Sequence, residues 1–202
     1  MFVKSRTERG WTVIAYPRRR LLMLICITES LVLLLALFMS KLFDIELFPV
    51  TGNILRELGT GTIEAIFPLA MFALTLTKKV ERIPIMGSLK KITINDIKAL
   101  FSHMQIMDIV VISALAGFAE ELLFRGILQV KFGIVLASVI FGILHCLTPA
   151  YFIVATIMGF YLGAVYHYHQ SILVPIQLHF VYDFCVLVYL RYFVKDNFVK
   201  SS

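Results

Sequence analysis

Long apolar runs separated by short polar segments dominate the chain. The runs, with approximate bounds, are 21–40, 61–77, 107–127, 132–148, 150–167 and 171–193. Each is long enough, or nearly so, to cross the roughly 30 Å hydrocarbon core of a bilayer at about 1.5 Å per helical residue. The sequence shows no strand alternation of useful length and no internal repeat. The pattern therefore predicts an all-α, polytopic transmembrane bundle with about six spans.

Polar positions divide this bundle. Glu64 and Pro68 interrupt the second run, and a short turn around Pro149 joins the fourth and fifth runs as in a helical hairpin. The basic stretch 78–106 separates a two-helix N-terminal part, 1–106, from a four-helix part, 107–202, and has room for a short amphipathic surface helix. The first run is too long, and lacks the small-residue cleavage pattern, for a removed signal peptide, so we expect it to be retained.

Composition supports membrane embedding. The chain is 59% hydrophobic and 16% charged, whereas a soluble domain is about 45–50% apolar and about 25% charged. The cysteines, Cys26, Cys146 and Cys185, all fall within apolar stretches and form no spaced motif. We interpret them as small buried hydrophobes rather than as a disulfide or a metal site.

The basic residues predict an orientation rather than a nucleic-acid partner. The formal net charge is +6, but most Lys and Arg residues lie between the apolar runs. Fifteen of them fall in the N-terminal, 78–106 and C-terminal segments, which share one side of a six-span bundle. Only Lys41, Arg56 and Lys131 fall on the opposite side. The positive-inside rule therefore predicts a multi-pass cell-membrane protein with both termini cytoplasmic.

Several polar residues lie inside predicted spans, where each charge costs about 2.5–3.5 kcal/mol even on the lenient insertion scale. They occupy three of the last four runs, and we expect them to converge in one cavity. They are Glu120, Glu121 and Arg125 in the third run, Phe141 and His145 in the fourth, and His179 and Asp183 in the sixth.

Helical spacing assigns roles within the third run. Glu121 and Arg125 are four residues apart, so they share a helix face and are expected to form an ion pair with a structural role. Glu120 is rotated by about 100° from Glu121 and has no partner at three or four residues' spacing. Ala116 and Gly117 precede it at those spacings and leave room for a helix or a water pocket. We therefore consider Glu120 a candidate general base.

The same spacing recurs on the other helices. His179 and Asp183 share a face, so Asp183 is placed to orient or charge-stabilise the imidazole, and Phe141 and His145 repeat the interval. The single acids of the first two runs, Glu29 and Glu64, are expected to make polar helix–helix contacts.

Together these motifs resemble a known family. Glu120-Glu121-x-x-x-Arg125, Phe141-x-x-x-His145 and His179-x-x-x-Asp183, in this order, are similar to the three motifs of the CAAX-protease and bacteriocin-processing (abortive-infection) membrane protease family. The resemblance covers roughly 107–193. It implies a membrane-immersed cavity and an intramembrane endopeptidase that acts on a peptide or membrane-anchored protein without a serine or cysteine nucleophile.

The resemblance also implies residue roles. Glu120 would activate the attacking water, His145 would assist the water or the protonation steps, and His179 with Asp183 would stabilise the oxyanion. Glu121 and Arg125 would hold their helix in register. The third motif more often ends in Asn, and an ionised Asp183 cannot donate a hydrogen bond to an oxyanion. Asp183 is therefore expected to raise the basicity of His179 instead, or the site differs in detail.

A cofactor is not expected, with zinc as the alternative. Glu120, His145 and His179 are acceptable zinc ligands, but the sequence lacks the His-Glu-x-x-His motif of zinc proteases. Two other functions stay open: a non-catalytic bacteriocin-immunity or scaffold membrane protein that binds a peptide or partner in the same cavity, and a small proton-coupled transporter.

Overall fold

The computed structural model describes residues 4–7, 10–13, 17–48, 52–77 and 83–194. Its helices, in chain order, are α1 (Arg18–Phe43), α2 (Ile54–Glu64), α3 (Ile66–Thr75), α4 (Pro84–Lys91), η2 (Ile92–Ile97), α5 (Lys98–Phe101), α6 (Ile106–Glu121), η3 (Leu122–Gln129), α7 (Val130–Phe132), α8 (Ile134–Leu144), α9 (Pro149–His169) and α10 (Leu173–Tyr192). The predicted all-α membrane bundle is confirmed. An antiparallel hairpin of β1 (Lys4–Thr7) and β2 (Gly10–Val13) precedes it. We did not predict this hairpin, because four-residue strands are too short to show a clear alternation.

The apolar runs correspond to helices, with one difference in length. Four helical stretches in the described part of the chain are long and apolar enough to cross a membrane: α1, α2 with α3, α9 and α10. The third predicted run lies in the continuous helix of α6, the π-helical η3 and α7. The fourth run, 132–148, forms only the 11-residue α8, which rises about 17 Å. This helix is shorter than predicted and reaches only part of the way across a bilayer.

Local signals in the sequence explain where α8 and α9 begin and end. Gly133, with φ at 87°, separates α7 from α8 in a backbone conformation that residues with a side chain rarely adopt. Thr148 caps α9 by accepting a 3.3 Å hydrogen bond from the Tyr151 amide, and Pro149 occupies the first turn, where a missing N–H costs nothing. The chain therefore turns back sharply after α8, and α8 packs along α9 as the predicted hairpin.

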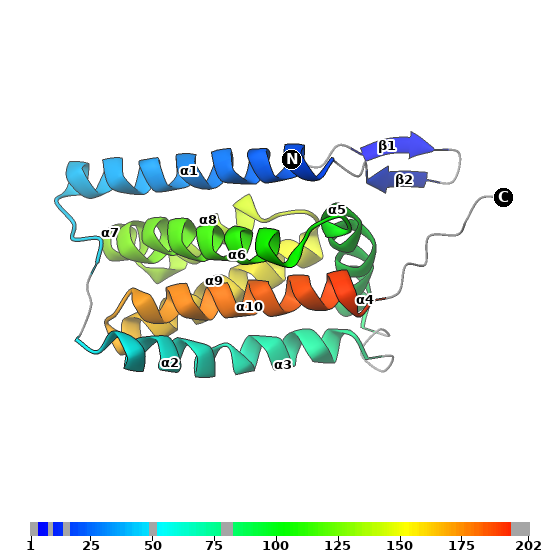
Figure 1. Cartoon of the computed structure of the whole chain (residues 1–202). Coiled ribbons are helices and arrows are strands. Elements are labelled where there is room, and N and C mark those ends of the chain that lie inside the picture. The colour runs from blue at the N-terminus through cyan, green and yellow to red at the C-terminus, as the bar shows by residue number, and fades with distance from the viewer. Residues whose placement is uncertain (1–3, 8–9, 14–16, 49–51, 78–82, 195–202) are drawn as a thin grey trace.

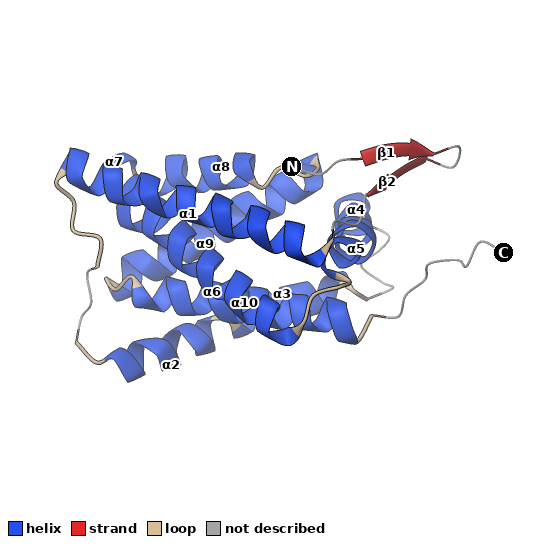
Figure 2. Ribbon diagram, turned by 45° about the horizontal axis from the view of Figure 1, so that its top comes forward, coloured by secondary structure: helices blue, strands red, loops and turns tan. Residues whose placement is uncertain are grey.

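The helices form a bundle in which α6 and α10 lie side by side (Figure 1). α1 packs against α6 and η3, while α2 and α3 pack against α10 on the other side of the bundle. α8 and α9 complete the bundle behind α6 and α10 in the view of Figure 1. α4 and α5 lie across one end (Figure 2). The first two membrane helices thus flank the four-helix part that begins at Ile106.

Polar contacts show which helix ends share a side. At one end, Arg18 on α1 forms an ion pair with Asp108 on α6, and Arg191 on α10 donates a 3.1 Å hydrogen bond to the Met104 carbonyl. At the opposite end, the Lys131 ammonium lies over the Phe43 ring, 4.8 Å from its centroid. The start of α1, the end of α10 and the α4–α5 segment therefore lie at one end of the bundle (Figure 1).

Candidate functional site

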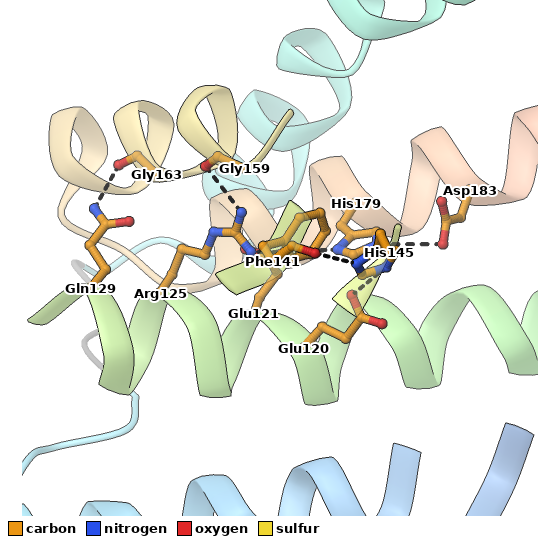
Figure 3. Close-up of polar contacts among 10 residues, drawn as sticks. All are labelled: Glu120, Glu121, Arg125, Gln129, Phe141, His145, Gly159, Gly163, His179 and Asp183. Carbon is orange, nitrogen blue, oxygen red and sulfur yellow. Dashed lines mark hydrogen bonds and ion pairs between the residues drawn. The ribbon is translucent and has the colours of Figure 1, made fainter. Parts of the chain in front are cut away.

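The third predicted span supplies the centre of the site. Glu120 and Glu121 are the last two residues of α6, and Arg125 follows in η3, where the helix is widened into π geometry. π-helical turns are rare and occur frequently at functional sites. The two carboxylates leave the helix in different directions, as consecutive helical positions must (Figure 3).

Glu121 and Arg125 form the buried ion pair that their spacing predicts. Arg125 Nη1 lies 3.0 Å from Glu121 Oε1, and the two residues are 1% and 0% exposed. The guanidinium also donates a 3.1 Å hydrogen bond from Nη2 to the Gly159 carbonyl of α9. It stacks over the Phe141 ring at 4.7 Å from the centroid. The pair therefore connects its own continuous helix to two others, α8 and α9.

Glu121 has a second partner that helical spacing did not reveal. The same Oε1 atom accepts a 2.8 Å hydrogen bond from His179 Nδ1 of α10. The other ring nitrogen, Nε2, lies 3.4 Å from Asp183 Oδ2 (Figure 3). His179 is thus held between two carboxylates from different helices. The contact across α6 and α10 depends on how the two helices pack, which single-helix spacing does not encode.

Glu120 faces His145 instead. His145 Nδ1 lies 2.8 Å from the Phe141 carbonyl, which can only accept, so Nδ1 carries the proton. In a neutral imidazole the lone pair is then on Nε2, and this atom lies 3.6 Å from Glu120 Oε2. The Phe141 ring stacks on the imidazole with centroids 4.2 Å apart. Among the described residues, the buried Glu120 Oε2 has no hydrogen-bond partner.

All four predicted catalytic residues line one cavity of about 490 Å³. Apolar side chains form most of its wall, and the polar members include Glu29, Tyr151 and Tyr182, which sequence reasoning did not assign to the site. Nothing in the spacing of the two tyrosines distinguishes them from interfacial aromatic residues.

The two single acids behave differently from each other. Glu64 makes the predicted helix–helix contact, because it accepts hydrogen bonds from the Tyr161 hydroxyl at 2.9 Å and is 3.1 Å from His169 Nε2. Glu29 was expected to do the same, but it lines the cavity, and its buried Oε2 has no hydrogen-bond partner in the described part of the chain.

The site contains side chains of types that bind metal ions. No group of three or more His, Cys, Asp or Glu side chains within the described residues is arranged to hold a metal ion. His145 and His179 nevertheless each bind a protein oxygen through Nδ1 and turn Nε2 elsewhere, which is how metal-binding histidines are commonly oriented.

The fold and the site define a multi-pass helical membrane protein with a buried glutamate–histidine cavity. Residues 102–185 match the family described as "Type II CAAX prenyl endopeptidase Rce1-like". The resemblance predicted from the three motifs is thereby confirmed for this segment, which contains all seven motif residues and excludes Glu29.

A relative and the solved structures complete the comparison. The chain is 37% identical over 98 residues to an uncharacterized protein, YpbD, of Bacillus subtilis (strain 168). The similarity covers 47% of this chain and 52% of that protein, so the chain spans about half the length of the curated relative that it matches. No solved structure matches the chain.

Proposed function

We propose that this chain is an intramembrane endopeptidase of the CAAX type, which cleaves a peptide or membrane-anchored protein with a water activated by glutamate. One observation carries the proposal. Glu120 Oε2, which has no hydrogen-bond partner among the described residues, and the imidazole lone pair on His145 Nε2 face each other in a cavity within a membrane bundle. The match of the surrounding segment to a family named for CAAX prenyl endopeptidases supports it.

The proposed chemistry begins at Glu120. A water molecule bound to Glu120 loses a proton to the carboxylate as its oxygen attacks the carbonyl carbon of the peptide bond. His145 Nε2 accepts a second hydrogen bond from this water and orients it. Glu120 then returns the proton to the nitrogen of the leaving group, so the base of the first step is the acid of the second.

His179 is proposed to stabilise the oxyanion of the tetrahedral intermediate. Glu121, which accepts from Nδ1, and Asp183, 3.4 Å from Nε2, place one acceptor at each nitrogen of a doubly protonated ring. In that form Nε2–H can turn from Asp183 to the developing negative charge, a type of contact that contributes several kcal/mol in other enzymes. Glu121 and Arg125 hold this arrangement in place rather than contacting the substrate.

We expect the reaction to proceed without a cofactor. If zinc is used instead, Glu120, His145 and His179 are the residues that would hold it, and it would supply Lewis-acid activation of the water. We further propose a location in the cell membrane with both termini cytoplasmic, because fifteen Lys and Arg residues fall in the N-terminal, 78–106 and C-terminal segments of the sequence.

The test uses the full-length protein purified in detergent and a panel of internally quenched peptides. Half of the panel carries a farnesylated Cys-aliphatic-aliphatic-X terminus, which the family name suggests as a substrate. The other half has the same sequences without the lipid. Wild type is expected to cleave members of the panel, and Glu120→Gln is expected to lower the cleavage rate at least a hundredfold, since general-base catalysis contributes about 10²–10⁴-fold.

Glu64→Gln is the matched control, because Glu64 is a membrane-helix glutamate outside the cavity lining. It should cleave like wild type. Treatment with a chelator should leave wild-type cleavage unchanged, whereas loss restored by added zinc would support the metal-dependent alternative. Full activity of Glu120→Gln would contradict the proposed mechanism, and proton flux in liposomes without peptide turnover would favour a transporter.

A further inference from the structure

Glu29 stands out on a helix that otherwise faces outward. α1 is the most apolar of the four helical stretches in the described part of the chain that are long enough to cross a membrane, and most of its large side chains, such as Ile27 and Leu31, are exposed on the bundle surface. Glu29 is only 8% exposed and lies on the inner face of α1. A carboxyl group in this position is costly in a membrane and is typically associated with function.

The surroundings of Glu29 are those of the reaction cavity. Glu29 lines the same cavity as Glu120, His145 and His179, and its carboxyl lies within electrostatic range of these residues. Its Oε2 is buried without a hydrogen-bond partner among the described residues. No Lys or Arg in the described part of the chain lines this cavity.

Glu29 is not needed to attach α1 to the bundle. Arg18 binds Asp108 through two hydrogen bonds of 2.5 and 2.7 Å at one end of the α1–α6 contact. Further along α1, the fully buried Ala36 packs in the apolar cluster that contains Leu122 and Leu123. These contacts lie on both sides of Glu29 along the helix, which leaves its carboxyl available to a molecule in the cavity.

A peptide in this cavity brings polar groups that require partners. The N–H and C=O groups of an extended peptide backbone cost free energy if they are buried against apolar walls without hydrogen bonds. On the α1 side, the polar lining residues are Thr28 and Glu29, and the Thr28 hydroxyl already donates to the Leu24 carbonyl at 2.9 Å. Glu29 is therefore the α1 side chain in this cavity with a buried oxygen that lacks a hydrogen-bond partner among the described residues.

We propose that Glu29 is a substrate-binding residue that hydrogen-bonds the peptide backbone from the α1 side of the cavity, while Glu120 and His145 act on the scissile bond. This inference rests on the proposed function for the identity of the ligand as a peptide. It adds a residue that lies outside the segment matched by the family. It also explains why α1, which carries none of the three motifs, lines the cavity.

The experiment measures binding separately from cleavage. All variants carry Glu120→Gln, so that bound peptide is not turned over, and affinity is measured by fluorescence anisotropy with fluorescent versions of the farnesylated and unmodified peptides. Glu29→Gln keeps the acceptor oxygen that a peptide N–H requires and adds an NH2 donor, so it is expected to bind within about twofold of the parent. Glu29→Leu removes both and is expected to bind about tenfold more weakly, as for the loss of one hydrogen bond to a charged or buried partner.

A control and a stability measurement separate binding from folding. Ser30→Leu makes a similar polar-to-apolar change at the adjacent, exposed position and should not change the affinity. Glu29→Leu should melt at the same temperature as its parent or higher, because it replaces a buried carboxyl by an apolar group in a membrane protein. A residue with a merely structural role would lower the melting temperature and leave the affinity unchanged.

Each outcome bears on the inference. If Glu29→Leu binds the peptides with unchanged affinity, the inference is contradicted. If Glu29→Gln and Glu29→Leu weaken binding equally, the negative charge is what matters, and Glu29 recognises a cation of the substrate rather than its backbone. If peptide binding depends on Glu29 but wild type cleaves none of the panel, the proposed endopeptidase activity is refuted and the role of Glu29 in peptide binding is supported. If neither type of peptide binds, both are wrong.

Discussion

A single oxygen atom, Glu121 Oε1, connects the buried charges of the site. It accepts hydrogen bonds from Arg125 on its own helix and from His179 on α10. Arg125 in turn reaches the Gly159 carbonyl of α9. A buried ion pair is weak evidence for stability by itself, but removal of one partner leaves an uncompensated charge and is strongly destabilising. The consequence of a substitution here can therefore be predicted from which charge remains.

Arg125→Met is expected to lower the stability of the protein by roughly 3–5 kcal/mol, because the fully buried Glu121 carboxylate loses its guanidinium partner. Thermal unfolding in detergent should show this as a clear decrease in the melting temperature. Lys131→Met removes a cation six residues further along the same continuous helix, at an exposed position over the Phe43 ring. The loss of that contact should cost at most about 1 kcal/mol. Equal melting temperatures for the two variants would contradict the structural role of Arg125.

At the scale of the element, the site depends on the close approach of α6 and α10. A Cβ atom added at Gly117 would lie 3.1 Å from the Ile176 carbonyl oxygen and 3.1 Å from the Phe180 amide nitrogen. Both are backbone atoms, so they cannot move aside without displacement of α10. Gly117 lies one turn before Glu121, and the close contact at this point brings His179 within hydrogen-bond distance of Glu121. Small residues commonly allow this kind of helix contact in membranes.

Gly117→Val is therefore expected to push α10 outward and to break the Glu121–His179 hydrogen bond. Cleavage of the peptide panel should fall about a hundredfold, as for a displacement of about 1 Å in other active sites. Ala114→Val is the matched control, because Ala114 lies one turn earlier on the exposed face of α6. Gly117→Val with wild-type activity would show that the α6–α10 contact does not position His179.

These two scales explain which features could be predicted from the sequence. Hydropathy predicts the helices, and spacing within one helix predicts the Glu121–Arg125 pair, because both depend on neighbours along the chain. The Glu121–His179 hydrogen bond and the position of Glu29 depend on which helices meet, and no local pattern contains that information. The early end of α8 was also hidden, because Cys146 and Leu147 continue the apolar run beyond the helix.

At the scale of the whole molecule, the distribution of charge makes a prediction about orientation. Arg18 and Arg191 lie at the same end of the bundle as α4 and α5, and Lys131 lies at the opposite end. The basic residues of α4 and α5, Lys90, Lys91 and Lys98, therefore share an end of the bundle with Arg18 and Arg191. Because Lys and Arg near the ends of spans are retained on the cytoplasmic side, this end is expected to face the cytoplasm.

Labelling of single cysteines in whole cells tests this orientation. The background variant has Cys26, Cys146 and Cys185 replaced by alanine. Two single-cysteine variants are made from it, each at an exposed loop position: His103→Cys, between α5 and α6, and Glu46→Cys, between α1 and α2. A membrane-impermeant maleimide should label Glu46→Cys in intact cells and His103→Cys only after permeabilisation. The opposite pattern would place the basic end outside. The α4–α5 segment, whose Leu100 and Phe101 line the cavity wall, would then face away from the cytoplasm, as would the Arg18–Asp108 ion pair. Substrates would in that case have to be sought on the outer side of the membrane.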